Sequence, residues 1–249
     1  MPTIFESAVV EGSVRPMVMY QRLPETSIFG GGDIQVYAVQ LRVPITDRLG
    51  LIATKDGYID LNPDNGSDEE GFADVAAGLK YALIDDREAG LIVSPGFVFE
   101  VDAGNHDVFQ GNGDGVLRTF VSAGLARADF NLLGNLGFNL PVDGADETHS
   151  LDYHLHLSYD AHEHVQPLVE VHGISFTRNA RALPVNFEGG DLINLGASRV
   201  AGQNVFTGAI GARFPINDTV SLGAAYEFPL GSRNDLLADR FTFDAVISF

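Results

Sequence analysis

The C-terminal segment of this chain alternates between apolar and polar side chains up to its last residue. The two faces of residues 240–249 are Phe241, Phe243, Ala245, Ile247 and Phe249 on one side, and Arg240, Thr242, Asp244, Val246 and Ser248 on the other. A β-strand places successive side chains on opposite faces. The segment is therefore predicted to be a strand with one apolar and one largely polar side.

The same alternation recurs along most of the chain, whereas helical periodicity is nearly absent. Strands are predicted near 14–23, 33–45, 49–61, 72–84, 88–101, 115–128, 130–141, 149–161, 165–177, 203–216, 219–230 and 240–249. They are longer than the roughly five or six residues typical of globular sheets. A tilted strand needs about 9 to 11 residues to cross a bilayer core, so these lengths favour a membrane barrel.

The connections alternate between short and long. Short turns are expected at 45–48, 85–87, 129, 162–164 and 217–219, and long polar loops at 24–32, 62–71, 102–114, 142–148, 178–202 and 231–239. Short periplasmic turns opposite long external loops are typical of bacterial outer-membrane barrels. We predict a closed antiparallel up-and-down transmembrane barrel of about twelve strands, with a soluble β-sandwich as the competing fold. Residues 14–249 form this single domain, and residues 1–13 either extend the first strand or lie in the lumen.

Composition excludes several classes of protein. The chain has 249 residues, 15 of them basic and 34 acidic, for a net charge of −19. Nucleic acid, a polyanion, is thus not an expected partner. No run approaches the about 18 to 20 apolar residues of a transmembrane helix. Cysteine is absent, so neither disulfides nor Cys-ligated metals are available.

Two further features resemble known proteins. Phe249, preceded by alternating apolar residues, resembles the assembly signal of bacterial outer-membrane proteins. Residues 71–83, 191–199 and 211–230 resemble the outer-membrane family named for the MetA pathway of phenol degradation. The resemblance implies uptake of hydrophobic or aromatic compounds, with outer-membrane lipid and the outer-membrane assembly machinery as partners. The chain has no Trp, so an interfacial girdle would consist of Tyr and Phe.

Six of the seven histidines lie between residues 149 and 172. A hairpin centred on Glu163 would place His156 opposite Glu170 and His154 opposite His172, all four on the lumen side. Imidazole and carboxylate ligands suit Zn or Cu, so these four residues are candidate metal ligands. A proton-sensitive gate, or polar side chains that bond one another in a wet lumen, are the alternatives.

Charged residues recur on the lumen side of the predicted strands. They are Arg42, Asp74, Lys80, Glu100, Arg118, Glu170, Arg213, Glu227 and Asp244. Such groups line a channel or pair across the bore, and in a barrel of this size we expect pairing, for example of Arg213 with Glu227. A narrow selective pore remains the alternative.

The sequence therefore predicts an outer-membrane channel or transporter for passive passage of small, hydrophobic or aromatic molecules. A closed structural or adhesive barrel is the second hypothesis, with the acidic loops near 64–70, 102–114 and 143–147 binding a partner or cations. A barrel hydrolase that uses Ser150, Ser158 or Ser175 with the histidines is the third and weakest, since no GxSxG or HExxH motif occurs. We expect no enzyme and no cofactor.

Overall fold

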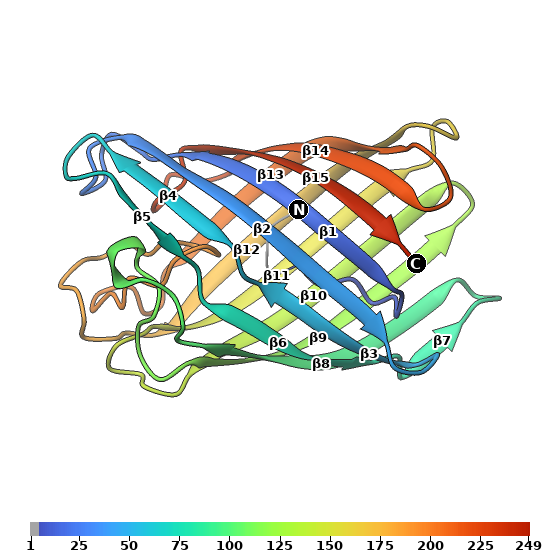
Figure 1. The fold of residues 1–249 in the computed structure, drawn as a ribbon, viewed down its shortest axis with the longest axis horizontal. Coiled ribbons are helices and arrows are strands. Elements are labelled where there is room, and N and C mark those ends of the chain that lie inside the picture. Colours follow the sequence, from blue (N-terminus) through green and yellow to red (C-terminus); the bar gives the residue numbers. More distant parts are fainter. Residues whose placement is uncertain (1–4) are drawn as a thin grey trace.

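The structure is a computed structural model that describes residues 5–249, and the fold is an all-β barrel (Figure 1). The strands are β1 (Ser13–Arg22), β2 (Gly32–Pro44), β3 (Leu49–Lys55), β4 (Tyr58–Pro63), β5 (Glu69–Phe72), β6 (Val75–Tyr81), β7 (Ile84–Asp86), β8 (Leu91–Val101), β9 (Val116–Arg127), β10 (Phe130–Pro141), β11 (His149–Tyr159), β12 (Gln166–Arg178), β13 (Asn204–Pro215), β14 (Val220–Pro229) and β15 (Asp239–Ser248). A single 3-10 turn, η1 (His106–Val108), lies in a loop. No helix in the described part of the chain is long and apolar enough to cross a membrane.

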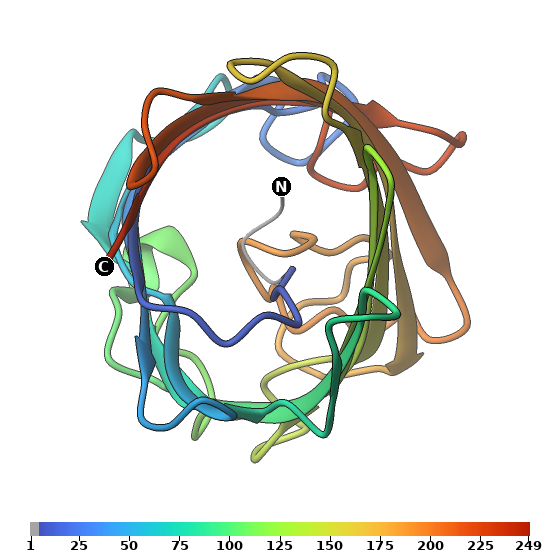
Figure 2. The same cartoon turned by 90° about the vertical axis from the view of Figure 1, so that its right-hand side faces the viewer.

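The sheet closes on itself because β1 pairs with both β2 and β15 (Figure 2). All pairings between strands are antiparallel. We call each full crossing of the barrel wall a stave. β3 with β4 forms one interrupted stave, and β5, β6 and β7 form another, so the fifteen strands make a closed antiparallel barrel of twelve staves. The predicted fold and strand count are confirmed, and the soluble sandwich is wrong because all fifteen strands belong to one closed sheet.

Two predicted strands are interrupted where the chain bends inward. The stave predicted at 49–61 breaks at Gly57, whose φ is +118°. A side chain there would meet the carbonyl oxygen of Tyr37 at 2.3 Å, so glycine is required. Asp56 Oδ1 instead accepts a hydrogen bond from the Val39 amide at 2.8 Å. The next stave starts earlier than predicted, at Glu69, inside the expected loop 62–71.

Loops and turns divide between the two ends of the barrel as predicted. The long connections gather at one end, called here the loop end, and the short turns and the C-terminus lie at the other, the turn end (Figure 1). The loop of residues 179–203 departs from the expectation of an external loop. It folds into the barrel, where Leu192, Ile193, Ala197 and Val200 are buried (Figure 2).

Apolar side chains cover the outside of the barrel. Exposed examples from different strands are Val18, Phe97, Val121, Leu136, Leu155, Val171, Ile210 and Phe243. Aromatic pairs lie near both ends: Phe130 and Tyr159 at the turn end, with ring centroids 4.8 Å apart, and Tyr58 and Phe72 at the loop end, 5.3 Å apart. An apolar band flanked by aromatic residues is the surface of a lipid-embedded barrel.

An arginine on this outer surface tests its contact with lipid. Leu155 is 57% exposed in the middle of β11. Leu155→Arg is expected to lower the unfolding free energy in lipid vesicles by about 2 to 4 kcal/mol, whereas Leu155→Ala should lower it far less. Urea unfolding followed by circular dichroism measures both. An arginine variant as stable as the alanine variant would contradict a lipid-facing position.

Candidate functional site

The lumen-facing histidines form one hydrogen-bonded cluster on β11 and β12. The register places His154 opposite His172 and His156 opposite Glu170, as the hairpin centred on Glu163 predicted. The Nδ1 atoms of His154 and His172 are 3.0 Å apart, and His156 Nδ1 lies 2.7 Å from Glu170 Oε1. His172 Nε2 lies 3.3 Å from Glu170 Oε2. All four side chains are buried.

The cluster continues through a carboxylate to an arginine. His154 Nε2 lies 3.0 Å from Asp152 Oδ1, and Arg118 Nη2 donates to the same oxygen at 2.5 Å. Arg118 also donates to Asn135 Oδ1 at 2.7 Å. The result is a chain of titratable groups from Arg118 to His156, linked by hydrogen bonds and by the contact of His172 Nε2 with Glu170.

No group of three or more His, Asp or Glu side chains among residues 5–249 is arranged to hold a metal ion. The hydroxyls of the hydrolase hypothesis also bond elsewhere. Ser150 Oγ accepts from Asn139 Nδ2 at 3.1 Å, and Ser175 Oγ donates to Asn204 Oδ1 at 2.5 Å. Neither hydroxyl is therefore engaged by an imidazole as a nucleophile would be.

Residues 5–12 lie inside the barrel near its turn end (Figure 2). Glu6 holds this segment to the barrel wall, because its carboxylate accepts hydrogen bonds from Arg42 Nη2 at 2.7 Å and from Lys80 Nζ at 2.7 Å. The Glu6 carbonyl accepts from Ser122 Oγ at 2.7 Å. Phe5 packs against the His154 ring, with centroids 5.6 Å apart. Of the positions considered for residues 1–13, this part is lumenal and β1 begins at Ser13; residues 1–4 lie outside the described range.

Two further ion-pair groups lie on the barrel wall around Asp244 and Glu227. Arg213 Nη2 lies 3.0 Å from Asp244 Oδ1, and Arg15 Nη2 lies 2.5 Å from Asp244 Oδ2. Glu227 instead pairs with Arg240 at 2.6 Å. The expected pair of Arg213 with Glu227 is wrong because the β13–β14 register places Ala209, four residues away from Arg213, opposite Glu227.

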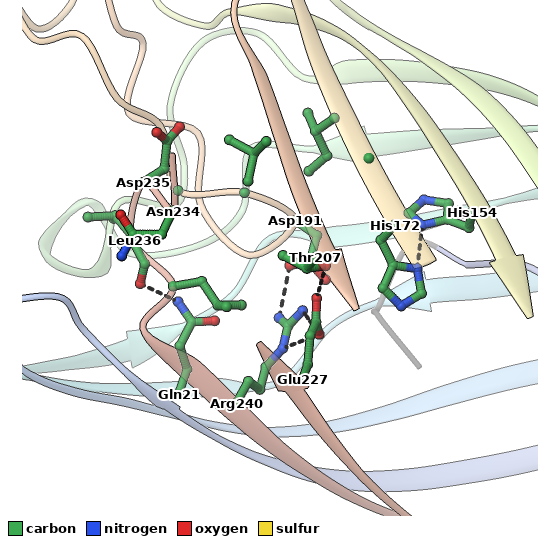
Figure 3. A pocket seen from close by; sticks show the side chains of 16 residues that line it. Gln21, His154, His172, Asp191, Thr207, Glu227, Asn234, Asp235, Leu236 and Arg240 are labelled. Atoms are coloured by element: carbon green, nitrogen blue, oxygen red, sulfur yellow. Dashed lines mark hydrogen bonds and ion pairs between the residues drawn. The ribbon is translucent and has the colours of Figure 1, made fainter. Parts of the chain in front are cut away.

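Arg240 joins the wall to the inward loop. Its Nη1 donates to Asp191 Oδ1 at 2.8 Å, while Nη2 donates to Glu227, which also accepts from Thr207 Oγ1 (Figure 3). Arg240, Glu227 and Gln21 line a small cavity, in which Gln21 Nε2 donates to the Leu236 carbonyl at 2.9 Å. Fully buried Arg240 thus fixes both the barrel wall and the loop of residues 179–203.

Glu100 lies in an acidic group beneath the loops. Lys55 Nζ donates to Glu100 Oε1 at 2.6 Å and lies 3.8 Å from Asp74 Oδ2. Glu147, on the loop 142–148, is buried beside a cavity of about 100 Å³ that Lys55 and Glu100 also line. Burial, reinforced by the negative charge of Glu100, raises the pKa of Glu147 from 4.5 to about 8.

The loop-end half of the lumen is apolar on one side. Met17, Met19, Ile34 and Val36 on β1 and β2 point inward and are buried, together with Ile59 and Leu61 on β4. Leu192, Ile193 and Leu195 of the inward loop pack against them. The barrel therefore holds an apolar cluster at the loop end, packed against the inward loop, and charged groups toward its middle and turn end.

Every charged or histidine side chain predicted to face the lumen has an ionic or hydrogen-bonding partner. Several partners were missed. Asp152 and Arg240 share the polar parity of their strands, so alternation alone could have identified them. Glu6 and Asp191 lie in segments without periodicity, and the sequence carries no signal for them.

Comparison with solved structures finds barrels of the same plan. This chain is similar to an outer-membrane channel from Pseudomonas putida F1, with a TM-score of 0.63 and 14% identity over 100% of this chain and 99% of that one. It is also similar to the NanC porin, with a TM-score of 0.58 and 10% identity over 96% of this chain and 98% of that one. The KdgM porin gives a TM-score of 0.55 and 11% identity over 95% of this chain and 99% of that one. What this chain shares with them is the fold, a closed antiparallel β-barrel. No family model matches the chain, and comparison with curated proteins gives no match.

Removing the charge of Asp152 tests the buried cluster. Asp152→Asn leaves the buried Arg118 cation without a carboxylate to neutralise it, so it is expected to lower the unfolding free energy by about 3 kcal/mol. Asp160→Asn, at the exposed end of the same hairpin, should change it by about 0.5 kcal/mol or less. Urea unfolding in detergent micelles measures both, and equal effects would contradict the ion pair's role.

The raised pKa of Glu147 gives a stability that depends on pH. In the unfolded chain this carboxyl loses its proton near pH 4.5, but in the folded protein it keeps the proton to about pH 8. Its contribution to the unfolding free energy therefore falls as pH rises between these values. Glu147→Gln should be more stable than the wild type by about 4 kcal/mol at pH 8, since each pKa unit is worth about 1.4 kcal/mol, and nearly equal to it at pH 4.5. A difference that does not change with pH would contradict this.

Proposed function

We propose that this chain is a bacterial outer-membrane channel for passive passage of small hydrophobic or aromatic molecules. The apolar cluster inside the loop end of the barrel carries the proposal. A barrel that serves only as a scaffold needs no apolar surface inside, whereas binding sites for small molecules are mostly apolar with a few polar groups. The family resemblance of residues 71–83, 191–199 and 211–230 supports the same class of solute. A lipid environment and assembly through Phe249, whose side chain is 71% exposed, belong to this proposal.

The inward loop is the part that would have to move. Asp191 anchors it to Arg240 on the wall, and Leu192 and Ile193 pack against the apolar cluster of β1, β2 and β4. Passage from the loop end requires these contacts to loosen transiently, since Asp191 and Leu192 also line two cavities beside the loop. Movements of loops against a rigid barrel occur on nanosecond to microsecond timescales, which suits passive entry.

A closed structural barrel is the second candidate, because the middle of the lumen is filled by ion pairs. In that case the acidic loops would contact a partner or cations. The two candidates differ in whether solutes cross the membrane through the barrel.

Uptake into vesicles with a lipopolysaccharide outer leaflet separates them. Vesicles containing the protein should take up benzyl alcohol faster than protein-free vesicles do, and the protein should speed the uptake of glucose less. Asp191→Asn should raise uptake about fivefold, because about 1 kcal/mol of lost loop anchoring shifts an equilibrium by that factor. Asp107→Asn, on an exposed loop, is the control and should change nothing. If the wild type and Asp191→Asn both give the same uptake as protein-free vesicles, the result supports the structural barrel instead.

A further inference from the structure

Another cavity, separate from those beside Arg240 and Glu147, lies at the turn end beside the N-terminal segment. Its volume is about 290 Å³. A cavity of about 150 Å³ can hold benzene, so this one has room for a one-ring molecule. Three arginines, Arg15, Arg42 and Arg213, line it together with the apolar side chains of Phe5, Leu133 and Val246.

The buried charges around this cavity do not balance. Asp244 is shared by Arg15 and Arg213, at 2.5 and 3.0 Å. Two cations therefore face one carboxylate on the β1, β13 and β15 side of the cavity. Arg213 is half-buried and its second amino group donates only to the Ser221 hydroxyl, at 3.1 Å.

The same ratio holds in the neighbouring group, which is linked to the first because Arg15 and Arg42 both donate to Gln40 Oε1. Glu6 is shared by Arg42 and Lys80, each at 2.7 Å. Glu11 also lines the cavity, but it is exposed, so solvent screens its charge. Four cations thus meet two buried carboxylates. In an interior of low effective dielectric such an excess attracts an anion strongly.

We propose that this cavity binds a small organic carboxylate with an apolar body. Arginine binds carboxylates through paired hydrogen bonds, and the three arginines face the same space. Phe5, Leu133 and Val246 provide the surface for a ring. The inference names a solute class for the proposed channel and so rests on that function, but binding itself requires no passage.

Glu6 shows how the site accepts such a group. It is a carboxylate that the chain itself supplies to Arg42 and Lys80. A solute carboxylate competes with Glu6 for Arg42, so removing the Glu6 charge strengthens binding. Removing the Arg213 charge weakens it, while Arg15 continues to pair with Asp244 and the barrel remains folded.

Isothermal titration calorimetry of the detergent-folded protein tests this with benzoate and its neutral analogue benzyl alcohol. Benzoate should bind more tightly. Arg213→Gln should weaken benzoate binding by about tenfold, which is the effect of one hydrogen bond to a charged group, and leave benzyl alcohol unaffected. Glu6→Gln should strengthen it. Arg87→Gln, an exposed arginine on the hairpin after β7, makes the same change in net charge and should have no effect.

Equal affinities for benzoate and benzyl alcohol in the wild type and in Glu6→Gln would overturn the inference. So would inorganic phosphate binding as tightly as benzoate, since the apolar wall would then contribute nothing. The vesicle measurement is independent of this result. If benzyl alcohol enters but benzoate shows no preference, the channel stands and the carboxylate site fails. If benzoate binds but nothing enters, the site stands and the channel fails.

Discussion

The antiparallel pairing of β1 with β15 is the constraint on which the other features depend. Within lipid, unpaired backbone amides and carbonyls cost several kcal/mol each, so a sheet can face lipid only if it has no open edge. Closure forces alternate side chains into a shared interior. The apolar set then covers the outside, and the polar set from twelve staves meets within a narrow bore.

That interior is held by paired charges rather than by a uniform core. Buried ions are stable only when they are paired and hydrogen-bonded, and the groups around Asp152, Glu6, Asp244 and Glu227 meet this requirement. Two non-strand segments complete the arrangement. Residues 5–12 supply Glu6 near the turn end, and the loop of residues 179–203 supplies Asp191 and the apolar residues that complete the loop-end cluster.

Periodicity in the sequence accounts for the predictions that were confirmed. A period of two located the strands and their inward faces, and a symmetric turn at Glu163 predicted the contact of His154 with His172. Prediction failed where contacts depend on the stagger of a closed sheet, as with Arg213, which pairs with Asp244 two strands away rather than with Glu227. It also failed for the loop around Asp191, whose polarity suits an external loop equally well. For residues 1–13 the sequence left a longer first strand and the lumen open, because this segment has no periodicity to choose between them.

The central claim is that the chain's own N-terminal segment occupies the bore of an otherwise channel-like barrel. Deleting residues 1–12 leaves every strand intact, since β1 begins at Ser13. Single-channel recording in planar bilayers compares this variant with the full chain. The account predicts small or brief conductance steps for the full chain and larger, steady steps for the truncated one. Equal conductance in the two proteins would contradict it.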